Sequence, residues 1–176
     1  MQVQPLSQVG ITEKLGFSTQ KTIWGAGCLL TSFTMAINYL AGTRFSVVQM
    51  NDALKAANAF AGGSFMRDKA FGRFGYRPVI GHAAAGDIRA ELEDGHPVIV
   101  GVDFEAGSSS GYSGADHFIL AVRVAPDGGI VCIDPAPLRG AVEVTLDASL
   151  SRTFTDAHGK QVHWQGVEMT LFRPLK

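Results

Sequence analysis

The apolar residues follow a helical period in the first half of the chain and a strand-like period in the second half. From Cys28 to Leu40 they recur every three or four residues, which predicts a largely buried helix with Cys28 in its first turn. Residues 46–57 repeat this pattern. Ser46 and Gln49 have the spacing of a capping box, which marks the beginning of a second helix.

Three other segments of the first half have a less regular pattern. Residues 1–24 mix polar residues and glycine with isolated apolar residues, which predicts an irregular approach to the first helix. Residues 61–82 combine glycines with aromatic and basic residues, and we expect a long loop there with one short turn of helix. Residues 87–94 predict a third short helix, which Gly95 ends.

From Pro97 onward, the apolar runs and the β-branched residues predict strands. Because helices precede strands, we expect an α+β fold, in which an N-terminal buried helix packs on an antiparallel β-sheet of four to six strands. Neither a repeat nor a Pro- or Ser-rich linker divides the sequence, so a single domain is expected over residues 1–176. The expected strands are residues 97–103, 117–124, 130–134, 142–146 and 167–172.

Composition and charge restrict the class of function. Of the 176 residues, 46% are hydrophobic and 18% are charged, which excludes intrinsic disorder and a coiled coil. The formal net charge is −1 and the basic residues form no run, so neither nucleic acid nor an anionic membrane surface is an expected partner. No apolar window reaches the roughly 18 residues that a spanning helix needs, so we expect no membrane insertion.

The first residues give an expectation for localisation. Met1 is followed by Gln-Val-Gln-Pro, without the basic segment and apolar core of a signal peptide. We expect a protein that acts in the cytoplasm, is released by another route such as a phage particle or cell lysis, or has lost its leader. Two cysteines, Cys28 and Cys132, leave the redox compartment open, and the sequence is compatible with one disulfide between them.

Cys28 is the most informative residue for chemistry. A thiol at a helix N-terminus faces unpaired backbone N–H groups and the positive end of the helix dipole, which favour the thiolate and lower the pKa of the thiol. Gly25 and Gly27 carry no side chain that would shield the sulfur. Its position therefore favours a nucleophile over the alternative, a small buried apolar residue, which is the usual role of a free cysteine.

His117 and Asp134 are the expected partners of this thiol. His117 begins a strand after a polar loop at 105–116, a common place for a catalytic group. Asp134 ends the next strand, where its carboxylate can accept the second imidazole N–H and fix the tautomer. The alternatives are an exposed histidine at a strand start and an ordinary Asp-Pro strand terminator.

The register of the hairpin decides whether these two residues meet. With a four-residue loop at 126–129, Asp134 lies opposite Ala121, about 13 Å along the strand from His117. A triad therefore requires a two-residue loop at 126–127, with the two following glycines absorbed as a bulge.

The other titratable residues are weaker candidates. Cys132 has neither a helix end nor a basic neighbour, and we interpret it as a core residue. A zinc site formed by Cys28, His117 and Asp134 is conceivable, but the sequence has no close-spaced ligand pair, so we expect no metal and no cofactor. The remaining histidines, none of which begins a buried strand, are His82, His96, His158 and His163.

Four short segments occur in an informative order. They are Thr22-Ile23 and Gly27-Cys28 with Thr31-Ser32, Met35 and Gly42; Gly95-His96-Pro97-Val98-Ile99-Val100; Asp116-His117-Phe118-Ile119-Leu120; and Ile133-Asp134-Pro135. Together they resemble a papain-like cysteine peptidase, most closely the bacteriocin-leader-processing peptidase-like family, over about residues 5–147. The chain departs from that pattern at Leu29, where many relatives have a small residue, which predicts a narrower cleft.

The resemblance implies a papain-like fold and cleavage of an amide bond, peptide or isopeptide, in a peptide or protein substrate. By motif, Cys28 corresponds to the nucleophile, His117 to the base and Asp134 to the orienting residue. In that family an upstream glutamine helps to form the oxyanion hole. We choose Gln8 for this role, because its position before Leu15-Gly16 and Thr22-Ile23 resembles the form of this element in which the glutamine lies far upstream of the cysteine. Gln20, which is nearer to Cys28, is the alternative.

Three functions agree with these residues. The first is a bacterial or phage cysteine hydrolase with a Cys-His-Asp triad. The second is a cell-wall peptide hydrolase, which shares that architecture and triad. The third is a catalytically silent papain-like module with a binding or structural role. Faster alkylation of Cys28 than of Cys132 distinguishes the two enzymes from the silent module.

Overall fold

The computed structural model describes residues 1–104, 115–137, 142–155, 159 and 161–175. The helices are α1 (Ile23–Ala26), α2 (Cys28–Leu40), α3 (Val47–Ala56), α4 (Arg67–Gly72) and α5 (Ala85–Glu93). The strands are β1 (Phe60–Ala61), β2 (Ser64–Phe65), β3 (Tyr76–His82), β4 (Val98–Asp103), β5 (His117–Val124), β6 (Ile130–Asp134), β7 (Val142–Leu146), β8 (Ser151–Thr155) and β9 (Gln161–Pro174). No helix in these ranges is long and apolar enough to cross a membrane.

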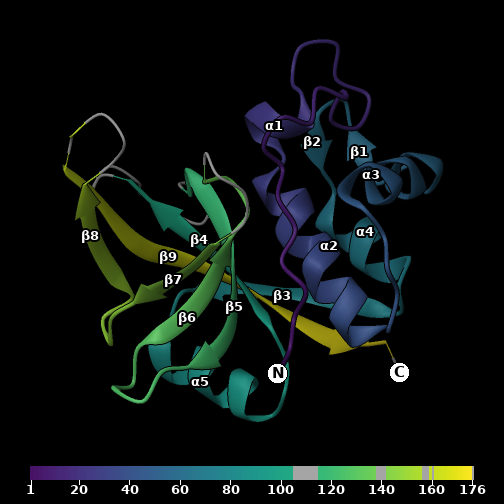
Figure 1. The fold of residues 1–176 in the computed structure, drawn as a ribbon. Coiled ribbons are helices and arrows are strands. Elements are labelled where there is room, and N and C mark those ends of the chain that lie inside the picture. The colour runs from purple at the N-terminus through teal and green to yellow at the C-terminus, as the bar shows by residue number, and fades with distance from the viewer. Residues whose placement is uncertain (105–114, 138–141, 156–158, 160, 176) are drawn as a thin grey trace.

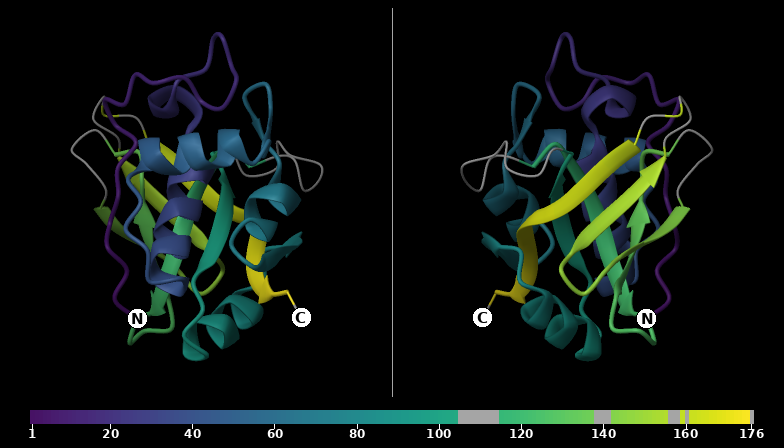
Figure 2. Two further views of the ribbon diagram at one scale, coloured as in Figure 1. Left: turned by 90° about the vertical axis from the view of Figure 1, so that its right-hand side faces the viewer. Right: turned by 90° about the vertical axis from the view of Figure 1, so that its left-hand side faces the viewer.

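A seven-stranded antiparallel sheet organises the fold (Figure 1). Its strands lie in the order β3-β9-β4-β5-β6-β7, and β8 pairs with β9 outside this path. The long strand β9 has three partners, because it pairs with β8 at its beginning, with β4 at its middle and with β3 at its end. Figure 2 shows β9 crossing the molecule as the longest strand. The sheet thus has more strands than the four to six expected.

Helices pack on both faces of this sheet, and each face has its own apolar cluster. Successive strand residues point to opposite faces, so Ile99 and Leu120 lie in the cluster with α2, while Val100 and Ile119 lie in the cluster with α5. On the α2 side, Phe33 is the centre of an aromatic cluster that includes Phe71 of α4 and Phe172 of β9. This packing fixes α2 between α4 and the sheet, and the α+β fold is confirmed.

Several elements have the predicted bounds for the predicted reasons. Helix α2 begins at Cys28, and all of its residues from Leu30 to Ile37 are buried. In α3 the capping box is complete, since Ser46 Oγ accepts from the Gln49 N–H at 3.2 Å and Gln49 Oε1 accepts from the Ser46 N–H at 2.8 Å. Strands β5, β6 and β7 also begin and end where the pattern predicts.

The prediction of a long loop over residues 61–82 is wrong for most of that segment. The expected short turn of helix is present as α4, but the segment also contains β2 and β3, and β3 pairs with β9 along its whole length. The period-2 pattern of a half-buried strand is absent from β3 because β3 lies at the end of the sheet order, where Val79 and Ile80 are both exposed. Pro78, which cannot donate to a ladder, is typical of such an edge strand.

Strand β8 and the first part of β9 are also absent from the predictions. The expected strand at 167–172 covers only part of the second half of β9. Strand β8 is at most half-buried along its length, so its sequence lacks the apolar run of a core strand. The expected loop at 105–116 lies outside the described residues up to residue 114.

Candidate active site

Cys28 is the first residue of α2, and the short helix α1 leads directly to it. Thr22 caps α1, since its side-chain oxygen accepts a hydrogen bond from the Gly25 N–H at 3.1 Å. A Cβ on Gly27 would lie 2.4 Å from the carbonyl oxygen of Ile23, so only glycine fits where α1 passes into α2. This junction places the sulfur at the N-terminal end of α2, among backbone N–H groups that the helix leaves unpaired.

Cys28 and His117 share a hydrogen bond and favourable charge interactions. Burial by itself raises the pKa of the Cys28 thiol, but the hydrogen bond and the charge of His117 outweigh it. Backbone hydrogen bonds from Phe118 and Leu29 lower this pKa further, so that it lies below its ordinary value. Burial also lowers the pKa of His117, but hydrogen bonds with Asp134 and Cys28 raise it from 6.5 to about 9. Both shifts favour a thiolate beside an imidazolium.

The second contact of His117 is a carboxylate. His117 Nε2 lies 2.8 Å from Asp134 Oδ1, and both residues are buried. Oδ1 also accepts a hydrogen bond from the Ala136 N–H at 2.9 Å, which holds the carboxylate at the end of β6. The structure therefore brings the three predicted residues together in the order thiol, imidazole, carboxylate.

The hairpin of β5 and β6 brings His117 and Asp134 together, but its strand register differs from the one expected from the sequence. The turn occupies residues 125–129, and the bulge lies within β5 at Val122 rather than at the two glycines. Beyond the bulge, the register places Asp134 opposite Ile119, two residues along β5 from His117 and on the same face. Such diagonal neighbours are about 7–8 Å apart, a separation that the two side chains bridge. The tight loop expected from the sequence is therefore wrong, although the expected pair forms.

Gln8 and Gln20 have different surroundings. Gln8 is buried: its N–H donates to the Pro135 carbonyl at 2.9 Å, and its Nε2 donates to the Trp24 carbonyl at 2.7 Å. Trp24 lies in α1, one helical turn before Cys28. Gln20 is exposed in the loop between Gln8 and α1. The structure thus holds Gln8 between the end of β6 and the beginning of the cysteine helix.

The α+β architecture agrees with a comparison against known protein families. A model of the family described as Peptidase_C39-like matches residues 2–162. The chain belongs to the Peptidase_C39-like family. This membership supports the papain-like cysteine peptidase superfamily and implies peptidase chemistry on a peptide substrate. No curated protein matches the chain.

In this member of the Peptidase_C39-like family, aromatic side chains cover the imidazole, and sequence analysis missed them. The ring of Trp164 on β9 lies 5.7 Å from the ring of His117, and the ring of Phe104 lies 6.1 Å from each of these two rings. Trp164 is buried and excludes water from one side of the imidazole, which strengthens its contact with Asp134. A tryptophan in the polar stretch before residue 167 was the available signal.

The remaining candidates in this Peptidase_C39-like chain have other surroundings. Cys132 is fully buried, burial raises the pKa of its thiol, and both cysteines are free. The other described histidines are His82 on β3, His96 before β4 and His163 on β9, while His158 lies outside the described residues. Within the described part of the chain, no cluster of His, Cys, Asp and Glu side chains could hold a metal ion.

Proposed function

We propose that this chain is a cysteine peptidase that cleaves an amide bond, with Cys28 as nucleophile, His117 as general acid and base, and Asp134 as the orienting carboxylate. One observation carries the proposal: His117 Nε2 is 2.8 Å from Asp134 Oδ1, and the same imidazole is hydrogen-bonded to a thiol at a helix N-terminus. A nucleophile, a base and a group that orients the base are what covalent acyl transfer needs.

The proposed reaction proceeds in two halves. The Cys28 thiolate attacks the substrate carbonyl carbon, and a C–S bond forms as the carbonyl oxygen takes up the negative charge. The C–N bond then breaks, and the His117 imidazolium gives its proton to the leaving amine. Neutral His117 next takes a proton from water, whose oxygen attacks the thioester and releases the acid and the Cys28 thiolate. Asp134 keeps the imidazole in the tautomer and orientation that both halves require.

For the oxyanion we propose two donors, the backbone N–H of Cys28 and the side chain of Gln8. Gln8 Nε2 carries two hydrogens, and one of them is engaged with the Trp24 carbonyl at 2.7 Å. That bond gives the amide a fixed direction beside α1, and the second hydrogen serves the oxyanion. Preorganised donors of this kind need no reorganisation as charge develops.

Within the superfamily, we propose a relative of the bacteriocin-leader-processing peptidases. The order of the four sequence motifs over residues 5–147 supports this placement. A cell-wall peptide hydrolase shares the triad, but the sequence carries no basic wall-binding repeat.

Alkylation by iodoacetamide at neutral pH tests the proposed function. The protein carries its own control, because Cys132 is fully buried with a raised thiol pKa while Cys28 is partly exposed with a lowered one. We expect mass spectrometry to find Cys28 labelled much faster than Cys132, and slower labelling of Cys28 in His117→Ala. Equally slow labelling of both thiols would favour the catalytically silent module.

A further inference from the structure

The first eight residues form a strap beside the cysteine helix. Residues 1–8 belong to no helix or strand, and Figures 1 and 2 show this segment passing along α2. The Leu6 N–H donates to Met35 Sδ, in the second half of α2, at 3.2 Å. The Gln8 side chain donates to the Trp24 carbonyl of α1, just before α2 begins. The strap therefore leads along α2 to the end of the helix that carries the thiol.

The end of the strap is fastened to the residue that follows Asp134. The Pro135 carbonyl accepts two hydrogen bonds, one from the Gln8 N–H at 2.9 Å and one from Ser7 Oγ at 3.3 Å. Ser7 Oγ also accepts from the Val9 N–H at 3.1 Å, so the hydroxyl closes a turn while it holds the carbonyl. Pro135 is itself buried. The oxyanion candidate and the carboxylate of the candidate triad are thus fastened to one point of the chain.

The other contacts that hold the strap are weak. Met35 Sδ, which accepts from the Leu6 N–H, is a thioether and therefore a poor acceptor. Val3 is 9% exposed and packs in the apolar cluster on the α2 side of the sheet, but the residues on either side of it are exposed. A segment with few buried apolar contacts opens at a lower free energy than the whole protein unfolds. We therefore expect the strap to detach while the helices and the sheet stay folded.

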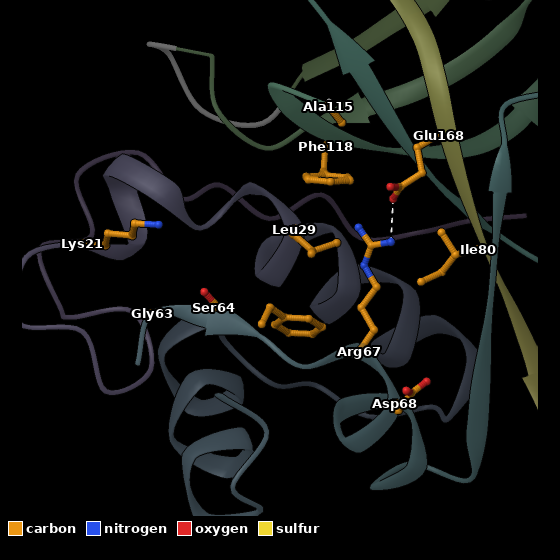
Figure 3. Close-up of a pocket in the computed structure, with 11 residues that line it drawn as sticks. Lys21, Leu29, Gly63, Ser64, Arg67, Asp68, Ile80, Ala115, Phe118 and Glu168 are labelled. Atoms are coloured by element: carbon orange, nitrogen blue, oxygen red, sulfur yellow. Dashed lines mark ion pairs between the residues drawn. The ribbon is translucent and has the colours of Figure 1, made fainter. Parts of the chain in front are cut away.

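Detachment of the strap would remove one proposed catalytic group and leave the others in place. Cys28 and His117 lie in α2 and β5, and they contact each other directly. The cavity of about 140 Å³ beside Cys28 and the groove that adjoins it have walls from α2, β2 and β5, and among the described residues the strap lines neither (Figure 3). Gln8, in contrast, would move with the strap and lose its bond to the Trp24 carbonyl. Detachment should therefore lower kcat and leave substrate affinity nearly unchanged.

We propose that the strap is a switch for the oxyanion donor and that Ser7 is the positioning residue that fastens it. With the strap seated on the Pro135 carbonyl, the Gln8 amide is held beside α1 and serves the oxyanion. With the strap detached, Cys28 stays reactive but turnover is slow. This inference rests on the proposed function, to which it adds a two-state element that controls one of the two oxyanion donors.

Ser7→Ala in the full chain tests the fastening role. We expect kcat on a cleavable peptide to fall about tenfold with KM nearly unchanged, because a side-chain oxyanion donor is worth about 100-fold and a misplaced donor keeps part of that effect. Alkylation of Cys28 should keep its wild-type rate. The alkaline limb of the pH–rate profile, which follows the His117 pKa of about 9, should stay in place because the contacts of His117 are unchanged. Ser7→Thr keeps the hydroxyl and should restore kcat.

Two comparisons separate this role from a general loss of stability. Ser18→Ala is the matched control and should leave kcat unchanged, because Ser18 Oγ accepts from the Gln20 N–H at 3.2 Å in a similar turn within its own loop. In the Gln8→Ala background, adding Ser7→Ala should change kcat by less than about twofold, since no side chain remains to be positioned. A full tenfold effect in that background, a displaced alkaline limb or slower alkylation of the thiol would overturn the role of Ser7.

Hydrogen exchange measured by NMR follows the strap without any turnover. Val3→Ala removes apolar contact that the seated strap makes, so the Gln8 N–H should exchange about tenfold faster. The Thr31 N–H, which donates to the Gly27 carbonyl at 2.8 Å, should exchange at its wild-type rate because α2 stays folded. Val144→Ala is the matched control, since Val144 is a similarly buried valine in the cluster on the α5 side of the sheet. It should leave the exchange of the Gln8 N–H unchanged.

The exchange and kinetic results separate failure of the strap from failure of the proposed function. Equal acceleration at Gln8 and Thr31 in Val3→Ala would mean that the strap opens only when the protein unfolds, and would overturn the switch. A reactive Cys28 with unchanged kcat in Ser7→Ala would overturn it as well. An unreactive Cys28 without cleavage would overturn the proposed function alone, because the exchange rates still decide whether the strap detaches locally.

Discussion

Ser32 and Phe118 are joined by a hydrogen bond that links the cysteine helix to the histidine strand. Ser32 Oγ donates to the Phe118 carbonyl at 3.2 Å, and the serine is fully buried. Ser32 lies one helical turn after Cys28, and Phe118 directly follows His117. The bond therefore holds α2 and β5 at the separation that the thiol and the imidazole need.

Ser32→Ala tests this positioning role. We expect kcat to fall about tenfold, because a 1 Å error in placing reacting groups is costly, and the free energy of unfolding to fall by about 1 kcal/mol. Since a looser contact with His117 stabilises the thiolate less, the acid limb of the pH–rate profile should move to higher pH.

Thr34→Val is the matched control for Ser32→Ala. Thr34 is equally buried on the same helix, but its hydroxyl donates to the Leu30 carbonyl within α2 at 2.7 Å. It should lower stability without moving the pH–rate profile. If both variants leave that profile unchanged, the Ser32 bond has only a structural role.

The shifted pKa values of Cys28 and His117 predict a bell-shaped pH profile. The thiolate forms at a lower pH than for an ordinary cysteine, so activity should rise on the acid side well below the ordinary thiol pKa. The imidazolium is lost as the pH rises through about 9, so activity should fall there. Stopped-flow alkylation of Cys28 at each pH reports the thiolate directly. An alkylation rate that rises only near the ordinary thiol pKa, with no rise at lower pH, would contradict the pairing.

Substitutions in the triad should have graded effects. Cys28→Ala and His117→Ala should abolish turnover, whereas Asp134→Ala should leave a residual rate because orientation is only part of the catalysis. Asp134→Ala also removes a hydrogen bond that raises the pKa of His117, so the alkaline limb should move to lower pH. Near-normal rates for His117→Ala, with loss in His96→Ala or His163→Ala, would mean that the base is misassigned.

The fold could be predicted where one local rule decided the structure. The start of α2 and the capping box of α3 follow from spacing alone, and the buried strand β5 follows from its apolar pattern. Strand β3 could not be found in this way, because it lies at the end of the sheet order and is stabilised by its pairing with β9, about 90 residues later. Tertiary pairing of this kind overrides a local preference for loop.

The candidate site also has parts that the sequence predicts and parts that depend on tertiary structure. Cys28, His117 and Asp134 are recognisable because each has a chemical reason to lie at the end of an element. The contact between His117 and Asp134 depends on a bulge at Val122, and no turn residue in the sequence indicates that bulge. Trp164 covers the His117 imidazole because of the path that β9 takes. In the sequence, β9 comes after a segment that lies outside the described residues.

Gln8 and Gln20 give opposite expectations for the oxyanion hole. Gln8 is buried and bonded to the Trp24 carbonyl, and residues 9–23 return to the body through a β-bridge between Lys14 and Thr22. Gln8→Ala removes a donor worth about 3 kcal/mol in the transition state, so kcat should fall about 100-fold with little change in substrate affinity. Gln20→Ala, at an exposed loop position, should be nearly silent.

Steady-state kinetics on both variants, with circular dichroism as a check on folding, decides between the two glutamines. In Gln8→Ala the backbone N–H keeps its bond to the Pro135 carbonyl, whereas the side-chain bond to the Trp24 carbonyl is lost together with the oxyanion donor. A 100-fold loss in Gln20→Ala with normal rates in Gln8→Ala would transfer the role to Gln20. Normal rates in both would mean that backbone N–H groups, that of Cys28 among them, stabilise the oxyanion without a side chain.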